Sequence, residues 1–175
     1  MTDQQAPPIA YSNLSPRPIG PFYRAAALAL PGVRAVRAQI EPYARAWQQA
    51  NTAALAAGAA GGALWVALGD SMTQGIGASR FDRGWVGQLG AQLARRGHQV
   101  RIVNLSVSGA RAGDVLADQL PAIARLGLRP ALVTVLIGSN DLMRRRHRDA
   151  LAGLFGELLD RLPAGAVIAN LPNPR

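Results

Sequence analysis

Short apolar segments alternate with segments of helical spacing over the last two-thirds of the chain. The apolar segments that we predict to be strands are Ala63–Leu68, Gln99–Leu105, Ala131–Ile137 and Ala166–Asn170. The segments that we predict to be helices are Trp85–Arg96, Asp114–Arg125 and Arg148–Arg161. Nearly continuous apolar strands separated by helices are typical of a parallel sheet covered on both faces. The sequence therefore predicts an α/β fold.

Two boundary signals refine these helices. Gly97 follows the first helix at a position where glycine commonly ends a helix, and Pro121 predicts a break or restart in the second. In the third helix, we expect one apolar face formed by Leu151, Leu154, Phe155, Leu158 and Leu159.

Residues 1–62 form a separate region in this interpretation. Residues 1–20 are rich in proline and polar residues, which predicts a tail that is loose or orders on contact. From Val33 to Ala54, apolar and small residues recur in steps of three and four, which predicts a helix packed on the domain, with a partner-binding arm as the alternative. Pro42 should kink this helix or lie in the first turn of a second one. We expect a tail and helical extension over 1–62 and an α/β domain over 63–175.

Composition excludes several classes of site. The chain has no cysteine, which excludes disulfides and thiolate metal sites. Its two histidines, His98 and His147, show no metal-ligand spacing, so we expect no metal and no cofactor. There is no apolar stretch of the ~18 residues that a membrane helix needs, and the first residues lack a secretory-signal pattern. We therefore expect a cytoplasmic protein.

The net charge of +9 is carried entirely by arginine. The densest run, Arg144 to Arg148, is most simply a solvated loop and helix start. An arginine-dependent nucleic-acid surface is the alternative, since arginine contacts phosphates well. The run has no interleaved aromatic residues of the kind that stack on single strands, so we expect no nucleic-acid partner.

Small polar residues follow three of the predicted strands. They are Gly69-Asp70-Ser71, then Asn104 to Gly109, then Gly138-Ser139-Asn140-Asp141. Strands of a parallel sheet end at one edge, so these loops should share a cleft. That cleft would hold a hydroxyl nucleophile, a glycine N–H and an asparagine amide, which is what acyl transfer requires. Each residue also has a plainer structural interpretation: turn glycines, helix-capping Asp70, Ser71 and Asp141, and a loop-tying Asn104.

These three blocks resemble the motifs of the SGNH (GDSL) hydrolases. Gly69-Asp70-Ser71 with Met72 is similar to the first block, Gly109 to the second, and Gly138 to Asp141 to the third. The resemblance covers about residues 63–175. It implies a flavodoxin-like three-layer sandwich and esterase, lipase or thioesterase activity. It also implies Ser71 as nucleophile, with its own N–H, the Gly109 N–H and the Asn140 amide as oxyanion donors. Asp70 would hold the serine loop through hydrogen bonds, while Asn104 and Asp141 support the loops.

The chain departs from this family at one motif. The family's Asp-x-x-His, which carries the general base, does not occur in these 175 residues. His147 directly follows the third block, and His98 precedes the second strand, at the opposite edge from the cleft. A serine without a base is a poor nucleophile. We therefore interpret the chain as a truncated reading frame, lacking a fifth strand and a last helix, whose intact parent is an active esterase.

The leading functional prediction is therefore a serine ester hydrolase that acts on a small-molecule ester and is very weak or inactive at this length. A non-catalytic binding module that keeps the cleft is the alternative, and an arginine-rich nucleic-acid binder is a third. Asp82, Arg83 and Trp85, which follow the serine loop, could line a pocket or cap a helix.

Overall fold

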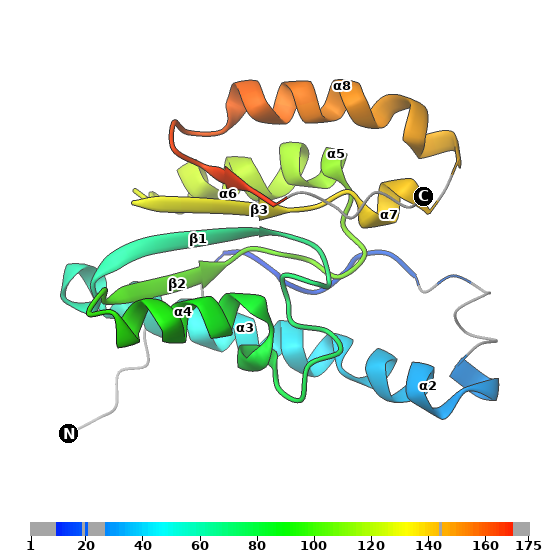
Figure 1. Ribbon diagram of the computed structural model, residues 1–175, viewed down its shortest axis with the longest axis horizontal. Coiled ribbons are helices and arrows are strands. Elements are labelled where there is room, and N and C mark those ends of the chain that lie inside the picture. Colours follow the sequence, from blue (N-terminus) through cyan, green and yellow to red (C-terminus); the bar gives the residue numbers. More distant parts are fainter. Residues whose placement is uncertain (1–9, 19, 21–26, 144, 170–175) are drawn as a thin grey trace.

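A four-stranded parallel sheet lies at the centre of the computed structural model, which describes residues 10–18, 20, 27–143 and 145–169 (Figure 1). The strands, in the sheet order β2-β1-β3-β4, are Val100–Asn104, Ala63–Gly69, Leu132–Leu136 and Val167–Ile168. All three strand pairs are parallel. The predicted α/β fold with a parallel sheet is confirmed, and each predicted strand is present within a few residues.

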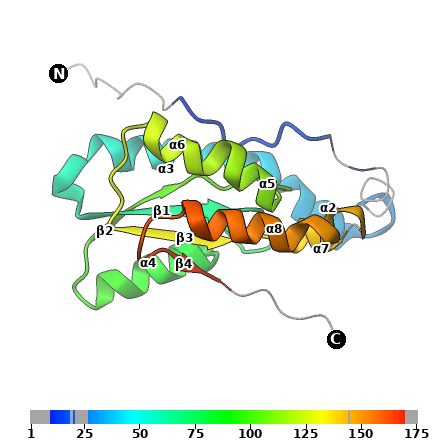
Figure 2. The same ribbon diagram turned by 90° about the horizontal axis from the view of Figure 1, so that it is seen from above.

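Helices cover both faces of this sheet, giving three layers (Figure 1). On one face lie α3 (Ile40–Ala56) and α4 (Trp85–Arg95). On the other lie the stretch from α5 (Ala112–Asp114) to α6 (Leu120–Arg125) and helix α8 (Arg145–Arg161). The remaining elements are α2 (Pro31–Ala38), α7 (Ser139–Leu142) and short 3₁₀ turns at Gly58–Gly61 and Phe81–Arg83. Seen from above in Figure 2, α8 lies over β3 and β4.

Side-chain alternation along β1 explains how both layers are held. Successive strand residues point to opposite faces, so Leu64, Val66 and Leu68 enter the core under α5, α6 and α8, where Leu158 is also buried. Trp65 and Ala67 enter a second core with Trp47 of α3 and Val86 of α4. Because β1 is buried on both sides, its sequence has no polar alternation.

The boundary signals in the sequence act as predicted. Gly97 has a φ of +83° just after α4, and it ends the helix there. Around Pro121 the regular helix is interrupted: a π-helical turn, Val115–Gln119, precedes α6, whose first turn contains the proline. A proline has no N–H to donate to the preceding turn, which accounts for the break.

Helix α8 corrects one detail of the prediction. It begins at Arg145, three residues earlier than expected, so the described part of the arginine run opens a helix. Leu158 is fully buried, but Leu159 is 61% exposed rather than part of the apolar face. One residue turns a helix by about 100°, which carries Leu159 away from the sheet.

The N-terminal extension packs on the sheet. The predicted helix is two helices, α2 and α3, and Pro42 lies in the first turn of α3. Helix α3 contacts β2 and buries Trp47. Residues 1–9 and 19 of the predicted tail lie outside the described residues. Segment 10–18, which we call the strap, runs beside α3 and the α5–α6 stretch (Figure 2).

A buried amide network joins the strap and α3 to β2. The Asn51 side chain accepts a hydrogen bond from the Asn104 N–H (2.7 Å) and donates one to the Asn104 carbonyl (2.8 Å), so it pairs with the strand as another strand would. Asn51 also donates to the side-chain oxygen of Asn13, whose own amide donates to the carbonyls of Asn104 and Ser106. Asn13, Asn51 and Asn104 are fully buried, and buried amides are stable only when bonded in this way.

No helix among the described residues is long and apolar enough to cross a membrane.

We predict that Asn51→Ala lowers the free energy of unfolding by about 2–3 kcal/mol, because it leaves the buried N–H of Asn104 and the buried side-chain oxygen of Asn13 without a hydrogen-bond partner. Urea denaturation of both chains measures this difference. Gln49→Ala, on the exposed side of the same helix, is the matched control and should stay within about 0.5 kcal/mol of the native chain. A similar loss in both variants would contradict the structural role assigned to Asn51.

Candidate active site

The three polar loops lie together at the carboxyl edge of the sheet, as predicted. Ser71, Gly109 and Asn140 come from the loops after β1, β2 and β3, and all three line one cleft of about 1230 Å³. The parallel pairing of β1 with both neighbours brings these strand ends to the same edge. Residues far apart in sequence therefore face a common space large enough for a small molecule.

A glycine makes the turn into Ser71 possible. Gly69 has a φ of +150°, and a Cβ at this position would lie 2.3 Å from the carbonyl oxygen of Leu136 and 2.3 Å from the Thr73 hydroxyl. No other residue fits between β1 and β3 at this point. The Gln119 side chain accepts a bond from the Gly69 N–H and donates one to the Gly69 carbonyl, both at 2.8 Å. The strand end that presents Ser71 is thus fixed from both sides.

Asp70 joins the first loop to the third. Its side chain is 1% exposed; one oxygen accepts from the Met72 N–H (3.0 Å), and the other from the Ser139 hydroxyl (2.6 Å) and the Asn140 amide (3.2 Å). Burial raises the pKa of Asp70, and the bonds from Ser139 and Met72 oppose that rise. The carboxylate therefore ties the serine loop to the Asn140 loop.

The Asn140 amide is already engaged in this arrangement. Its nitrogen donates to the Ala110 carbonyl at 2.9 Å and to Asp70 at 3.2 Å, so both hydrogens have acceptors. Donation to a substrate oxygen would have to replace one of these bonds, of which the bond to Asp70 is the longer.

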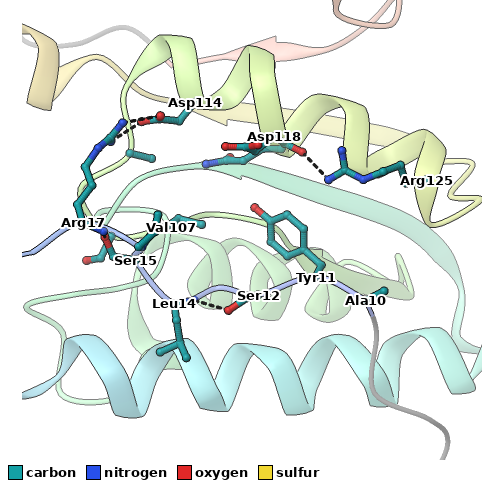
Figure 3. Close-up of a pocket in the computed structure, with 14 residues that line it drawn as sticks. Ala10, Tyr11, Ser12, Leu14, Ser15, Arg17, Val107, Asp114, Asp118 and Arg125 are labelled. Carbon is teal, nitrogen blue, oxygen red and sulfur yellow. Dashed lines mark hydrogen bonds and ion pairs between the residues drawn. The ribbon is translucent and has the colours of Figure 1, made fainter.

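Gly109 is held by the strap. It has a φ of +80°, and a Cβ there would meet nothing closer than the Ser15 hydroxyl at 4.0 Å, so its surroundings are open. The Arg17 guanidinium donates to the Gly109 carbonyl at 3.0 Å and forms a two-pronged ion pair with Asp114 at 2.5 and 2.6 Å (Figure 3). This contact connects an N-terminal residue to the backbone of the second loop.

Asn104 and Asp141 support the loops from behind. The Asn104 amide donates to the Thr73 carbonyl at 2.9 Å, and its oxygen accepts from the N–H and hydroxyl of Ser106. Asp141 accepts from the Ala112 N–H at 3.1 Å. Burial raises the pKa of Asp141, while the Ala112 bond and the charges of Arg111 and His147 lower it. Both residues are buried and link neighbouring loops, the arrangement that the sequence suggested for Asn104.

The other candidates lie away from this cleft. His98 is exposed beyond the end of α4, at the opposite edge of the sheet. Asp82 pairs with Arg80, and Trp85 packs on Trp65; neither they nor Arg83 line the cleft. Among the described residues, no group of three His, Cys, Asp or Glu side chains is placed to hold a metal ion.

A smaller cavity, of about 500 Å³, lies between the strap and the α5–α6 stretch (Figure 3). Tyr11 projects from the strap toward it and donates to the Leu105 carbonyl. Burial raises the pKa of Tyr11. Asp118 and Arg125 lie on its far side, and Ser108 lines both this cavity and the larger cleft.

Sequence reasoning missed the residues that hold the site from outside the motifs. Arg17, Asn13, Asn51 and Gln119 carry no motif or periodic signal, since their role depends on side-chain contacts with distant backbone. The share of the cleft formed by α2 was also missed, because its apolar spacing was interpreted as core packing.

The fold and this site define a hydrolase-type α/β domain with a serine at the sheet edge. The sequence model of the GDSL-like lipase/acylhydrolase family matches residues 67–174, more than half of the chain. The chain belongs to this family.

Two relatives agree with this assignment. Esterase TesA of Pseudomonas aeruginosa is 39% identical over 77 residues, which are 44% of this chain and 37% of TesA. The crystal structure of AlinE4, an SGNH-hydrolase family esterase, superposes with a TM-score of 0.52 at 27% identity, covering 65% of this chain and 61% of AlinE4. The chain thus spans less than two-thirds of the length of either relative.

The raised pKa of Asp70 predicts a pH-dependent stability difference. The native carboxyl holds its proton to higher pH than the unfolded chain does, where the ordinary value is 3.8. The native chain should therefore lose stability relative to Asp70→Asn as the pH rises through the interval between 3.8 and the raised value. Urea denaturation of both chains between pH 4 and pH 7 measures this, with Asp149→Asn controlling for the change in net charge. If the native chain instead becomes more stable relative to Asp70→Asn as the pH rises, the prediction is wrong.

Proposed function

We propose that this chain carries the acyl-transfer site of a serine ester hydrolase, with Ser71 as the nucleophile. The observation that carries the proposal is that Ser71, Gly109 and Asn140 line one cleft. The match to a lipase/acylhydrolase family supports the choice of ester chemistry. The substrate would be a small carboxylic ester.

The reaction would proceed in two halves. The Ser71 oxygen attacks the ester carbonyl carbon, and the carbonyl electrons move onto oxygen to give a tetrahedral oxyanion. The N–H groups of Ser71 and Gly109 and the Asn140 amide would stabilise that charge. The carbon–oxygen bond to the alcohol then breaks, the alcohol leaves with a proton, and an acyl group remains on Ser71. A water molecule attacks this acyl-enzyme, releasing the acid and restoring the hydroxyl.

The Ser71 proton needs an acceptor. The sequence contains no Asp-x-x-His, so these 175 residues do not supply that motif's general base, and we propose that water accepts the proton. An oxyanion site without its base retains only a small part of the full rate. We therefore propose that this chain acylates slowly, and that Asp70 acts by positioning the serine loop and Asn140.

A non-catalytic binding module is the second candidate. Two observations favour it: the missing Asp-x-x-His and the engagement of both Asn140 hydrogens with Asp70 and Ala110. In this alternative the cleft holds an ester or acid without cleaving it.

A fluorophosphonate probe separates the two candidates. We predict slow phosphonylation of Ser71 in the 175-residue chain, located by peptide mass spectrometry, because the phosphonyl oxygen occupies the position of the oxyanion. Asn140→Ala should slow labelling by about 10²–10³-fold through loss of a donor. Ser71→Ala should abolish it, whereas Ser79→Ala, an exposed serine of the same loop, should not change it. A folded chain that leaves Ser71 unlabelled would favour the binding module.

A further inference from the structure

Helix α2 has an apolar stripe that no core covers. Val33, Val36 and Ile40 are spaced three and four residues apart, at the α2–α3 junction, and so share one side. Helix α2 has no buried residue, and Val36 is 42% exposed. All three side chains line the cleft that contains Ser71. The stripe therefore faces the candidate active site and not the interior of the protein.

The position of this stripe is fixed relative to Ser71. Gln39, between α2 and α3, accepts a bond from the Gly77 N–H (2.7 Å) and donates to the Ala78 carbonyl (3.1 Å). The Tyr43 hydroxyl donates to the same carbonyl at 2.8 Å, and the Trp47 indole donates to the Gln74 carbonyl at 3.0 Å. These acceptors and donors belong to the loop that follows Ser71. The extension is thus attached to the serine loop through four hydrogen bonds.

Apolar groups also line the cleft from the domain itself. Ile76 follows Ser71 in its loop, and Met143, which is 61% exposed, follows α7. Together with the α2 stripe, these two side chains give the cleft that contains Ser71 several apolar lining groups. A cleft of about 1230 Å³ is larger than most small-ligand pockets. It can hold an alkyl chain of a dozen carbons beside a head group.

The charges that line the same cleft are mostly positive. The lining contains one acidic residue, Glu41, and four arginines: Arg17, Arg37, Arg45 and Arg111. Arg17 pairs with Asp114, and Arg45 with Glu41. Within the described part of the chain, neither Arg37 nor Arg111 forms an ion pair with a carboxylate.

Arg111 is placed close to the reacting groups. It lies two residues after Gly109, and its Nε is buried without a hydrogen-bond partner within the described structure. Its charge acts on Asp141 and lowers that residue's pKa, but no hydrogen bond joins the two side chains. Arg111 lines the cleft, and no carboxylate among the described residues forms an ion pair with its guanidinium, which favours an anionic group there.

From these observations we infer that α2 and Arg111 select the substrate: an amphiphilic ester with an alkyl chain against Val33, Val36 and Ile40 and an anionic group on Arg111 and Arg37. This inference rests on the proposed function for the ester, while the binding subsite stands on its own geometry. The selecting residues of α2 lie outside residues 67–174, the part that matches the family.

Calorimetric titration of the Ser71→Ala chain tests the subsite without requiring turnover. The probes are dodecyl phosphate, dodecyl maltoside and inorganic phosphate, each below its micelle concentration where one exists. We expect dodecyl phosphate to bind at least about tenfold more tightly than either other probe, since it alone offers both groups. Equal affinity for dodecyl phosphate and dodecyl maltoside would overturn the assignment of an anionic group to Arg111 and Arg37. If neither probe binds, the whole inference is wrong.

Paired variants locate the two halves. The double variant Val33→Ser with Val36→Ser should weaken the binding of dodecyl phosphate about tenfold or more. Ala35→Ser, which is exposed on the same helix and outside the cleft lining, should leave that binding unchanged.

The charge test uses Arg111→Gln and Arg37→Gln, each of which should weaken the binding of dodecyl phosphate and leave that of dodecyl maltoside unchanged, with Arg34→Gln as control. Circular dichroism confirms folding, and Arg37→Gln carries the charge test if Arg111→Gln unfolds. Variants that bind as the parent chain does would overturn the assignment.

The two proposals fail separately. Binding of dodecyl phosphate with the expected variant pattern, but without phosphonate labelling of Ser71 in the native chain, would leave the subsite standing and refute ester hydrolysis. Phosphonate labelling of Ser71 without binding of dodecyl phosphate would support ester hydrolysis and refute the subsite.

Discussion

The buried amide network around Asn104 is the constraint on which the site depends. Asn104 ends β2, and its N–H and carbonyl point away from β1 toward the Asn51 side chain, which bonds both. Its own side chain bonds Thr73 of the first loop and Ser106 of the second. Asn51 thus satisfies the backbone at the strand edge, and the Asn104 side chain couples the two loops. Each of these buried polar groups would lower the stability of the fold if it had no hydrogen-bond partner. The network therefore favours this one arrangement of the strand and the two loops.

The same network makes the N-terminal extension part of the site. Asn13 reaches the carbonyls of Asn104 and Ser106, and Arg17 reaches the carbonyl of Gly109. Gln39 and Tyr43 hold the opposite side of the serine loop. A segment outside the family match therefore fixes loops that carry the family motifs. The cleft walls therefore depend on the strap, α2 and the start of α3 as much as on the sheet.

The strands and most helix boundaries could be predicted because they depend on local chemistry. Apolar runs marked β1 and β3, Gly97 marked the end of α4, and Pro121 marked the break before α6. The three loops followed from the parallel sheet, which brings strand ends to one edge. Their catalytic roles stay predictions, as does the division of the chain at residue 62, across which α3 and β2 share buried hydrogen bonds.

Contacts between a side chain and distant backbone could not be predicted. Nothing in the sequence pairs Gln119 with Gly69 or Arg17 with Gly109, since neither contact has a period or a spacing. Periodicity did identify the apolar stripe of α2, but it says which residues avoid water and not what covers them. In the structure a cleft takes the place of a core there. Leu159 fails for a related reason, because it lies at the margin of the helix face.

The most direct measurement is a crystal structure of the chain after reaction with a phosphonate. This account predicts a covalent bond from the Ser71 oxygen to phosphorus. It also predicts that the phosphonyl oxygen lies within about 3 Å of the N–H groups of Ser71 and Gly109 and of the Asn140 amide, which has released Asp70. A phosphonyl oxygen turned away from Gly109, with Asn140 still bonded to Asp70, would contradict the account.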